Sequence, residues 1–263
     1  MKRGRRVAKV LARAGLCSRR EAERWISQGR VSVDGRVLDS AAINVPPGAE
    51  VRVDGKPLPE ALPPRLWRFH KPRGVLTTAR DPEGRPTVFE RLPPDLPRVV
   101  AVGRLDMDSE GLLLLTNDGD LARHMELPQT GWLRRYRVRV LGRVDETRLA
   151  GLSRGVSIRG ARYGPIHAAL ERQTGANAWL TVSLREGKNR EVRHVMAHLG
   201  YVANRLIRVG YGPFSLGDLA RGKVEEVPGK VVRRHHRVLS GARGDGDVPA
   251  AAARTRSHAD RRR

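Results

Sequence analysis

The sequence predicts an α+β protein in which a small N-terminal α/β unit precedes a larger domain with a mostly antiparallel mixed sheet. Two helix patterns followed by short alternating strands predict the small unit. A proline-rich stretch follows, and runs of strand patterns with few helices between them come next. We therefore divide the chain into the small unit at 1–58, a linker at 59–66, the larger domain at 67–232 and a basic, disordered tail at 233–263.

Composition limits the class of partner. The chain has 51 Lys+Arg and 28 Asp+Glu, a net charge of +23, which favours nucleic acid over an anionic membrane surface. Aromatic residues make up 4% and argue against a base-stacking sheet as the main binding device. Lys9 and Arg13 interrupt the N-terminal apolar pattern, so we expect no signal peptide and no membrane segment. The single cysteine, Cys17, fits a reducing cytoplasm.

The small unit combines two helices with strand pairs. Apolar residues at helical spacing predict the first helix over residues 7–14. Ser18, with Glu21 three residues later, predicts a capping box at the start of the second helix. "VSVDGRVL" predicts a hairpin that turns at Asp34 and Gly35, and "EVRVDGKPL" predicts a further strand.

Basic residues crowd these two helices, and the second helix begins with amides that could bind phosphate. A solvated basic face would give the same pattern. The candidate RNA contacts are Lys9, Arg13, Ser18, Arg19, Arg20 and Arg24.

The larger domain shows seven periodic segments. The predicted strands are "LWRFHKPRG", "GVLTTA", "EGLLLLTND", "RRYRVRVLG" and "AWLTVSL", and the predicted helices are "RVDETRLAGLSRG" and "REVRHVMAHLG".

A carboxylate, Asp106, stands in a loop before the apolar run Leu112–Leu115. Such a group loses solvation at the rim of a buried strand and needs a nearby cation to stay ionised. Arg104 is the local candidate, although an Asp–Arg pair that only holds the loop would look the same. Asp108 and Glu110 stand in no cationic context of their own, and we expect them at the surface.

Strand alternation puts Tyr136 on the same face as Val138 and Val140 and leaves the arginines between them on the other. The ring is therefore expected to be buried, with its hydroxyl seeking a partner. A core tyrosine bonded to backbone is the structural alternative.

Cations also crowd the start of the helix in "LREGKNREVRHVM", for which Asn189 is the expected N-cap. Lys188, Arg190 and Arg193 lie at the end where the helix dipole disfavours positive charge. We therefore expect an anion there, either a phosphate or a carboxylate of the protein. Lys188 is a second candidate partner for Asp106.

Metal and nucleotide-cofactor motifs give no support for a cofactor. His194 and His198 are four residues apart, but neither a Glu after His194 nor a clear third ligand accompanies them. The glycine fingerprints of dinucleotide and P-loop sites are absent from the sequence.

The quoted motifs, taken together, resemble known families. "ARAGLCSRREAERWISQGRVSVDGRVL" resembles the S4 RNA-binding domain. "HKPRGVLTT", "VGRLDMDSEGLLLLTNDGDLARHM", "RRYRVRV" and "LREGKNREVRHVM" resemble pseudouridine synthases of the RsuA branch, which modify bacterial ribosomal RNA. "GVSIRGARYGPIHAAL" and "NRLIRVGYGPFSLGDL" are most similar to the RluB type, which acts on large-subunit RNA. The resemblance covers about residues 5–232 and implies the pseudouridine synthase fold.

The resemblance implies roles for single residues. Asp106 corresponds to the catalytic aspartate, and Arg104, Tyr136 and Lys188 complete the catalytic group. Two positions depart from the common pattern: Ser109 replaces a frequent threonine, and His194 replaces a second basic residue. The implied RNA contacts of this domain are Lys71, Arg73, Asn189, Arg190 and Arg193.

The implied activity is isomerisation of a uridine in ribosomal RNA, most similar to enzymes of 23S RNA near the peptidyl-transferase region. It requires no cofactor or metal, and the target base must be flipped out of its helix. We expect a cytoplasmic monomer whose partner is 23S ribosomal RNA or a large-subunit assembly intermediate. The alternatives are a 16S RNA synthase, a glycosidic hydrolase with a second carboxylate, and a non-catalytic S4-type assembly factor. The last predicts the loss of Asp106 or Tyr136, and both are present.

Overall fold

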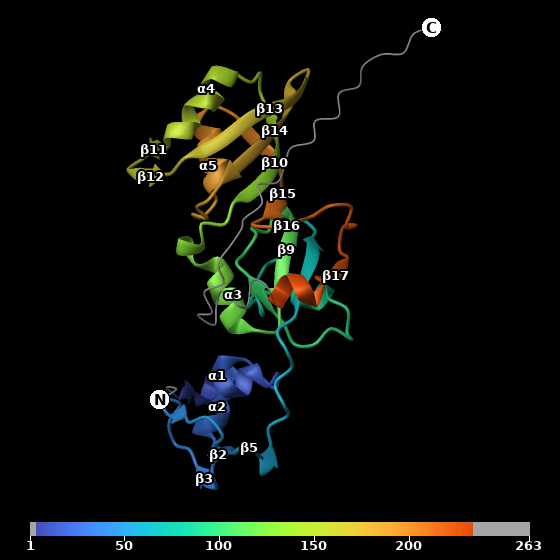
Figure 1. Ribbon diagram of the computed structural model, residues 1–263. Coiled ribbons are helices and arrows are strands. Elements are labelled where there is room, and N and C mark those ends of the chain that lie inside the picture. Colours follow the sequence, from blue (N-terminus) through green and yellow to red (C-terminus); the bar gives the residue numbers. More distant parts are fainter. Residues whose placement is uncertain (1–3, 234–263) are drawn as a thin grey trace.

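A computed structural model describes residues 4–233, which form a small lower unit and a larger upper domain joined by an extended segment (Figure 1). The basic tail predicted from the sequence lies outside the described residues, except for Arg233. None of the helices within 4–233 has the length and apolar character needed to cross a membrane.

The small unit contains both predicted helices and the predicted hairpin. Ser18 caps the second helix and accepts a hydrogen bond from the Glu21 amide at 3.0 Å, whereas the Glu21 side chain pairs with Arg24 instead of completing the capping box. The hairpin turns at Asp34 and Gly35, both with positive φ, as "VDGR" predicts. The elements are β1 (Arg5–Arg6), α1 (Val7–Arg13), α2 (Arg19–Ser27), β2 (Val31–Val33), β3 (Arg36–Val37), β4 (Asn44–Val45), β5 (Val51–Val53) and β6 (Lys56–Pro57).

The larger domain is built on a nine-stranded sheet. Its main path runs β13-β14-β10-β15-β9-β7-β17, with β16 on β15 and β8 on β9. Every pair is antiparallel except β15 with β9, which confirms the mostly antiparallel mixed sheet. The strands are β7 (Leu66–Lys71), β8 (Val100–Val102), β9 (Glu110–Thr116), β10 (Arg134–Leu141), β13 (Ile166–Thr174), β14 (Asn177–Leu184), β15 (Val202–Tyr211), β16 (Phe214–Ser215) and β17 (Val224–Glu226).

Three α-helices and shorter elements surround this sheet. The helices are α3 (Gly119–Glu126), α4 (Glu146–Gly151) and α5 (Glu191–His198). A separate hairpin joins β11 (Val156–Ile158) to β12 (Ala161–Tyr163), and 3-10 turns are η1 (Phe89–Arg91), η2 (Pro128–Thr130) and η3 (Leu152–Arg154).

The strand predicted from "GVLTTA" is wrong. That segment is a loop with a single bridge between Leu76 and Thr87. Gly74 begins it with a positive φ, and the Thr77 hydroxyl donates to the carbonyl of Leu105, so these residues bind a neighbouring loop and do not continue a ladder.

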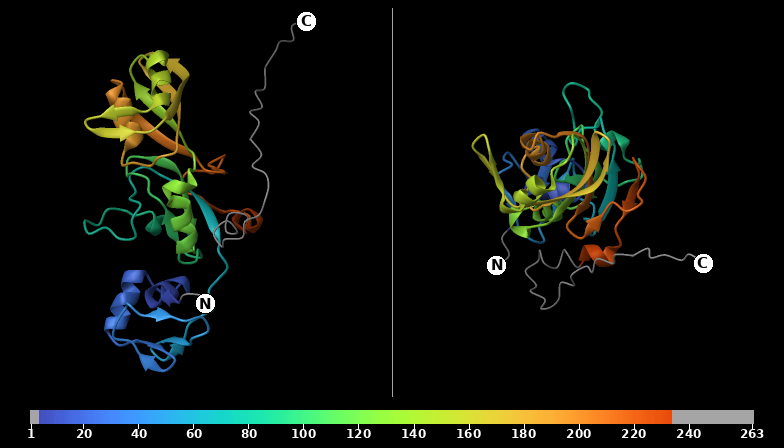
Figure 2. Two further views of the ribbon diagram at one scale, coloured as in Figure 1. Left: turned by 60° about the vertical axis from the view of Figure 1, so that its left-hand side comes forward. Right: turned by 90° about the horizontal axis from the view of Figure 1, so that it is seen from above.

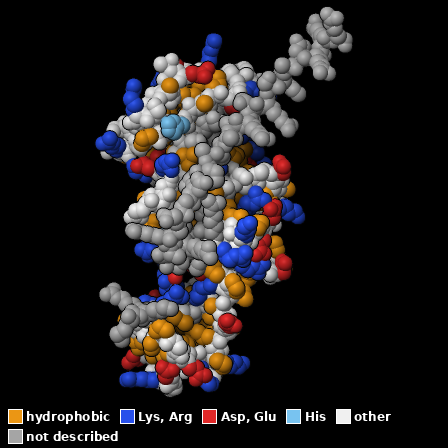
Figure 3. All heavy atoms as spheres, viewed as in Figure 1, with side chains coloured by type: hydrophobic (Ala, Val, Ile, Leu, Met, Phe, Trp, Pro, Cys, Tyr) orange, Lys and Arg blue, Asp and Glu red, His pale blue; other side chains and the backbone are white. Residues whose placement is uncertain are grey.

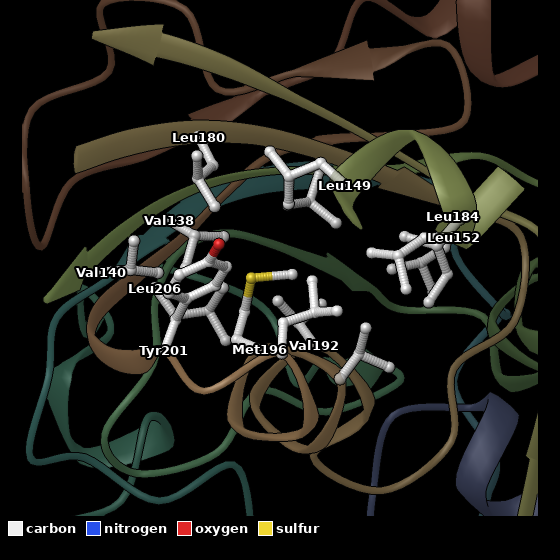
Figure 4. Close-up of a cluster of buried hydrophobic side chains, with 14 of the residues drawn as sticks. Val138, Val140, Leu149, Leu152, Leu180, Leu184, Val192, Met196, Tyr201 and Leu206 are labelled. Atoms are coloured by element: carbon white, nitrogen blue, oxygen red, sulfur yellow. The ribbon is translucent and has the colours of Figure 1, made fainter. Parts of the chain in front are cut away.

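One face of the β13-β14-β10-β15 segment packs against α4 and α5. Figure 4 shows Leu149 from α4 and Met196 from α5 directed toward Val138 and Leu180 of the strands, all of them buried. A second core lies between α3 and strands β8 and β9. The sheet therefore carries two separately packed halves, and β9 and β15 join them.

Gly111 stands at that junction. Its residue partner across the parallel pair is Arg208, its φ is +106°, and a Cβ built on it would overlap the backbone of Arg208. Only glycine fits without strain.

We predict that Gly111→Ala lowers the free energy of unfolding by at least about 3 kcal/mol, because both the φ angle and the backbone contact forbid a side chain. Urea denaturation followed by circular dichroism measures this loss. Gly119→Ala is the matched control, since open space surrounds Gly119 at the start of α3. Equal stability of the two variants would contradict the assigned strand pairing.

Candidate active site

A cleft of about 920 Å³ opens between the two halves of the sheet. The loop before β9, the strands β10 and β15, and the loop before α5 supply its walls. It gathers all four residues predicted to be catalytic: Arg104, Asp106, Tyr136 and Lys188.

The Asp106 carboxylate lies at the cleft with 32% of its side chain exposed, and its ion-pair partner within residues 4–233 is Arg190, with Nη1 3.6 Å from Oδ2. Both partners predicted from the sequence are wrong. Arg104 is exposed at the rim, and the Lys188 ammonium is held by Glu186 at 2.7 Å. The cation that reaches Asp106 therefore comes from the α5 loop, from a residue not assigned to this role.

The turn before α5 explains this replacement. Arg190, not Asn189, is the N-cap of α5, and it has a left-handed φ of 49° and no side-chain capping bond. The Lys188 amide is instead satisfied by Glu191, whose carboxylate oxygen accepts it at 2.9 Å. Burial raises the pKa of Glu191. The expectation of a carboxylate beside this helix start is thus confirmed, with Asp106 and Asp108 as the carboxylates.

Asp108 is partly exposed, with 34% of its side chain accessible, but the expectation that it has no cationic partner is wrong. Its carboxylate accepts both Nη groups of Arg190, at 3.2 and 3.1 Å, and lies 3.2 Å from Arg193. Burial acts to raise the pKa of Asp108, but the hydrogen bond from Arg190 and the charge of Arg193 outweigh it and hold this pKa below its usual value. Asp108 therefore holds in place both Arg193 and Arg190, the arginine that faces Asp106.

Glu110 is also misplaced by the surface prediction, since only 1% of its side chain is exposed. It begins β9 and forms ion pairs with Arg205 of β15 and with Arg221. The absence of a cation near it in the sequence concealed partners more than 90 residues away along the chain.

Lys71 was expected to contact RNA, and the structure contradicts this. Its side chain is fully buried, and its ammonium donates to the carbonyls of Pro72, Asp106 and Ser109 at 3.1, 3.0 and 2.8 Å. Burial lowers the pKa of Lys71 to about 8. The lysine is a positioning residue that fastens the Asp106 loop to the end of β7.

The remaining basic residues of this domain divide into two groups. Arg73 is exposed. Arg193 is half-buried and donates to the carbonyls of Ala203 and Asp108, so it holds β15 and the Asp106 loop together. Arg73, Asn189 and Arg190 are exposed enough to reach RNA, whereas the Arg193 guanidinium is already committed within the protein.

Tyr136 lies on the predicted face of β10. Its neighbours across the sheet are Val182 of β14 and Arg208 of β15, and its ring packs against the core formed with Val138 and Val140. It is partly buried and lines the cleft, which leaves its remaining surface available to a bound base.

The small unit meets the larger domain through two of its candidate RNA contacts. Lys9 pairs with Asp120 at 2.6 Å and Arg13 with Asp118 at 3.2 Å, both acids at the start of α3. Figure 3 shows Lys and Arg side chains gathered at this boundary, and the left-hand view in Figure 2 shows the two units apart from each other except there. Of the other candidates, Ser18 caps α2, Arg24 pairs with Glu21, and Arg19 and Arg20 are exposed.

The histidine pair has a structural contact. His194 lies 3.1 Å from the Tyr163 hydroxyl through Nδ1. Across residues 4–233, no three His, Cys, Asp or Glu side chains converge in a way that could hold a metal ion.

Comparison with known proteins identifies the class. Residues 5–51 match the S4 domain, and residues 65–198 match the RNA pseudouridylate synthase family. The chain belongs to this family and is an RNA pseudouridine synthase of the RsuA/RluB type, an isomerase with an S4 RNA-binding domain.

The chain is similar to two relatives and one solved structure in particular. The chain is 44% identical over 229 residues to an uncharacterised RNA pseudouridine synthase of Rickettsia felis, covering 87% of this chain and 99% of that protein. It is 45% identical over 218 residues to ribosomal large subunit pseudouridine synthase B of Salmonella typhi, covering 80% and 75%. A crystal structure of a pseudouridylate synthase shares the fold with a TM-score of 0.61, 24% identity and coverage of 88% and 99%.

We predict that Lys71→Met lowers kcat for pseudouridine formation at least about tenfold while changing RNA affinity less than about twofold, because a buried side chain that orients a loop acts on positioning and not on binding. Single-turnover kinetics and filter binding separate the two effects. Arg73→Ala, at the exposed position two residues later in the chain, should lower RNA affinity and leave kcat nearly unchanged. A loss of affinity in Lys71→Met at unchanged kcat would restore the RNA-contact role.

The depressed pKa of Lys71 also predicts a pH dependence of stability. Between pH 8 and 10.5 the unfolded chain holds this proton and the folded chain has released it, so the free energy of unfolding contributed by this group rises with pH in that window. Urea denaturation at several pH values should show the wild type gaining stability relative to Lys71→Met from pH 8 to 10.5. A constant difference would contradict the lowered pKa of Lys71.

Proposed function

We propose that this synthase isomerises a uridine of 23S ribosomal RNA near the peptidyl-transferase region, with Asp106 as the reactive carboxylate. The observation that carries the proposal is the position of Asp106, which lies partly exposed in the cleft beside Arg190 and shares that cleft with Tyr136. The similarity to ribosomal large subunit pseudouridine synthase B supports the choice of RNA.

At the ribose one bond breaks and one forms, and on the base a proton leaves C5 while N1 gains one. The N-glycosidic bond of the uridine is cleaved, the base turns, and its C5 carbon bonds to the same anomeric carbon of the ribose. Positive charge builds at that carbon, so an ionised carboxylate can act there as a nucleophile or as a base toward the ribose. Asp106 is the cleft carboxylate with the exposure and the adjacent cation that this role needs.

Tyr136 has a place in the same sequence of steps. Its ring can stack on the base while the base is detached, and its hydroxyl can take the proton from C5 after reattachment. The rigid β10 strand and the core behind the ring hold it in a single position, which is what a residue that guides a detached base requires.

The size of the cleft supports base flipping. A uridine inside a helix cannot reach a carboxylate that lies between two halves of a sheet, so the nucleotide must turn out of its stack. The cleft of about 920 Å³ is large enough for a nucleotide. Arg104 is exposed at its rim, where it can occupy the space that the flipped base leaves.

The roles of the basic residues change accordingly. Arg190 provides the charge beside Asp106 and, being 41% exposed, can also meet a backbone phosphate. Lys188 is directed to Glu186 and to the carbonyl of Arg162, so it shapes the loop that carries Arg190.

We predict that Asp106→Asn abolishes pseudouridine formation and keeps RNA affinity within about threefold, because the amide is isosteric but cannot act as a nucleophile or base. Pseudouridine mapping of ribosomal RNA in a strain that lacks the gene, complemented with wild type or variant, measures this. Asp218→Asn, at an exposed loop position, is the control and should restore the modification.

Two outcomes would contradict the proposal. Restoration of the pseudouridine by Asp106→Asn would remove the role of the carboxylate. A wild-type site in 16S RNA instead of 23S RNA would correct the substrate and leave the chemistry intact.

A further inference from the structure

Within residues 4–233, one face of the β13-β14-β10-β15 sheet has no helix against it. The helices α4 and α5 pack on the face that carries Val138 and Val140. On strand β10 the residues that alternate with Tyr136, Val138 and Val140 point to the opposite face, and these are Arg135, Arg137 and Arg139. We call this surface the arginine face, and it comprises Arg135, Arg137, Arg139, Arg172, Trp179 and Arg205.

The strand register aligns this face into a row. Arg139 of β10 is the direct partner of Trp179 on β14 and of Arg205 on β15, and Trp179 in turn is the partner of Arg172 on β13. Like charges directly opposite each other in a sheet are destabilising. The pairing of Arg139 with Arg205 carries this cost. Glu110 lowers it by neutralising Arg205, and an anion bound at Arg139 would lower it further.

Trp179 orders the guanidinium groups. Arg137 lies 4.7 Å and Arg205 5.8 Å from the centre of its ring, within the range of cation–π attraction. Two guanidinium groups thus lie against the indole, which leaves less of its surface for a base to stack on. The face therefore suits the sugar–phosphate backbone and not base stacking.

Carboxylates neutralise only part of the face. Glu171 pairs with Arg137, and the buried Glu110 pairs with Arg205. Among residues 4–233, no carboxylate forms an ion pair with Arg139 or Arg172, and both are exposed. Guanidinium groups in this state are preferred ligands of phosphate, which they bind through two parallel hydrogen bonds.

The arginine face is separate from the cleft. Tyr136, Leu184 and Leu206 line the cleft from the same three central strands but from the other face of the sheet. A nucleotide in the cleft and an anion on the arginine face are thus on opposite sides of one sheet, and the same short stretch of RNA cannot occupy both sides at once.

We infer that the arginine face binds the phosphate backbone of a second RNA segment, distinct from the one that enters the cleft, and does so without reading bases. The inference rests on the RNA-directed activity of the chain but not on Asp106 or on the 23S assignment. The catalytic domain alone would then bind a large folded RNA at two surfaces, the cleft and the arginine face.

The double variant Arg139→Ala/Arg172→Ala tests this, because it removes the two unneutralised charges and leaves the ion pairs. The matched control is Arg148→Ala/Arg154→Ala, which removes two exposed arginines from α4 and η3 on the other side of the sheet. The probe is deproteinised large-subunit ribosomal RNA, titrated in filter binding at several salt concentrations.

We expect the first double variant to bind this RNA about tenfold more weakly and its log Kd–log salt slope to fall by about 1.5–2, as the loss of two phosphate contacts predicts. The control should retain the wild-type affinity and slope. An equal loss of RNA affinity in both double variants would show that only the net charge of the protein matters. An unchanged affinity in the first double variant would show that the arginine face does not bind RNA. Either result overturns the inference.

A second substrate separates this inference from the proposed function. On a short stem-loop that holds the target uridine and fills only the cleft, the first double variant should form pseudouridine at the wild-type rate. A matching loss of rate on the stem-loop would place these arginines in the catalytic cleft and overturn the inference. If Asp106→Asn proved active, the proposed function would fail, but the binding measurement on the long RNA would still test the arginine face.

Discussion

The buried ammonium of Lys71 is the interaction on which the arrangement of the site depends. Its hydrogen bonds reach carbonyls at both ends of the Asp106 loop, so one group from β7 sets the path of the residues between them. A charged group without water is costly to bury and is retained only where its partners satisfy it. Three carbonyl acceptors meet that condition, and the loop is held to the rigid edge of the sheet as a result.

The ion pairs of the cleft depend on the loop that Lys71 holds. Asp108, in the same loop, holds Arg190 and Arg193 of the opposite wall, and Arg190 then faces Asp106. The two halves of the sheet are thereby joined in two ways: by the parallel pairing at Gly111 and by the acid–arginine contacts above it. In a protein with a net charge of +23, these two carboxylates position Arg190 and Arg193 at the cleft.

The sequence predicted those features that depend on local geometry. The Asp34–Gly35 turn, the cap at Ser18, the face of Tyr136 and the helix after Arg190 follow from patterns within a few residues, and the structure confirms them. The S4 resemblance and the synthase resemblance are confirmed by the family matches.

Features that depend on distant contacts were not predictable. Arg190 reaches Asp106 through a left-handed turn 84 residues later in the chain, whereas the nearby Arg104 does not. Lys71 has the residue type of an RNA contact, and only the three-dimensional path of the loop shows its burial. The central strand β15 was missed because "VANRLIRVGY" mixes arginines with apolar residues. Of the two arginines, the sheet buries Arg208 and leaves Arg205 partly exposed.

Hydrogen–deuterium exchange of the loop amides tests the anchoring role of Lys71 most directly. In Lys71→Met, the amides of residues 105–109 should exchange at least about tenfold faster than in the wild type, while those of β10 and β14 keep their protection. Unchanged exchange in the loop of a folded Lys71→Met protein would show that the ammonium does not hold Asp106 in place.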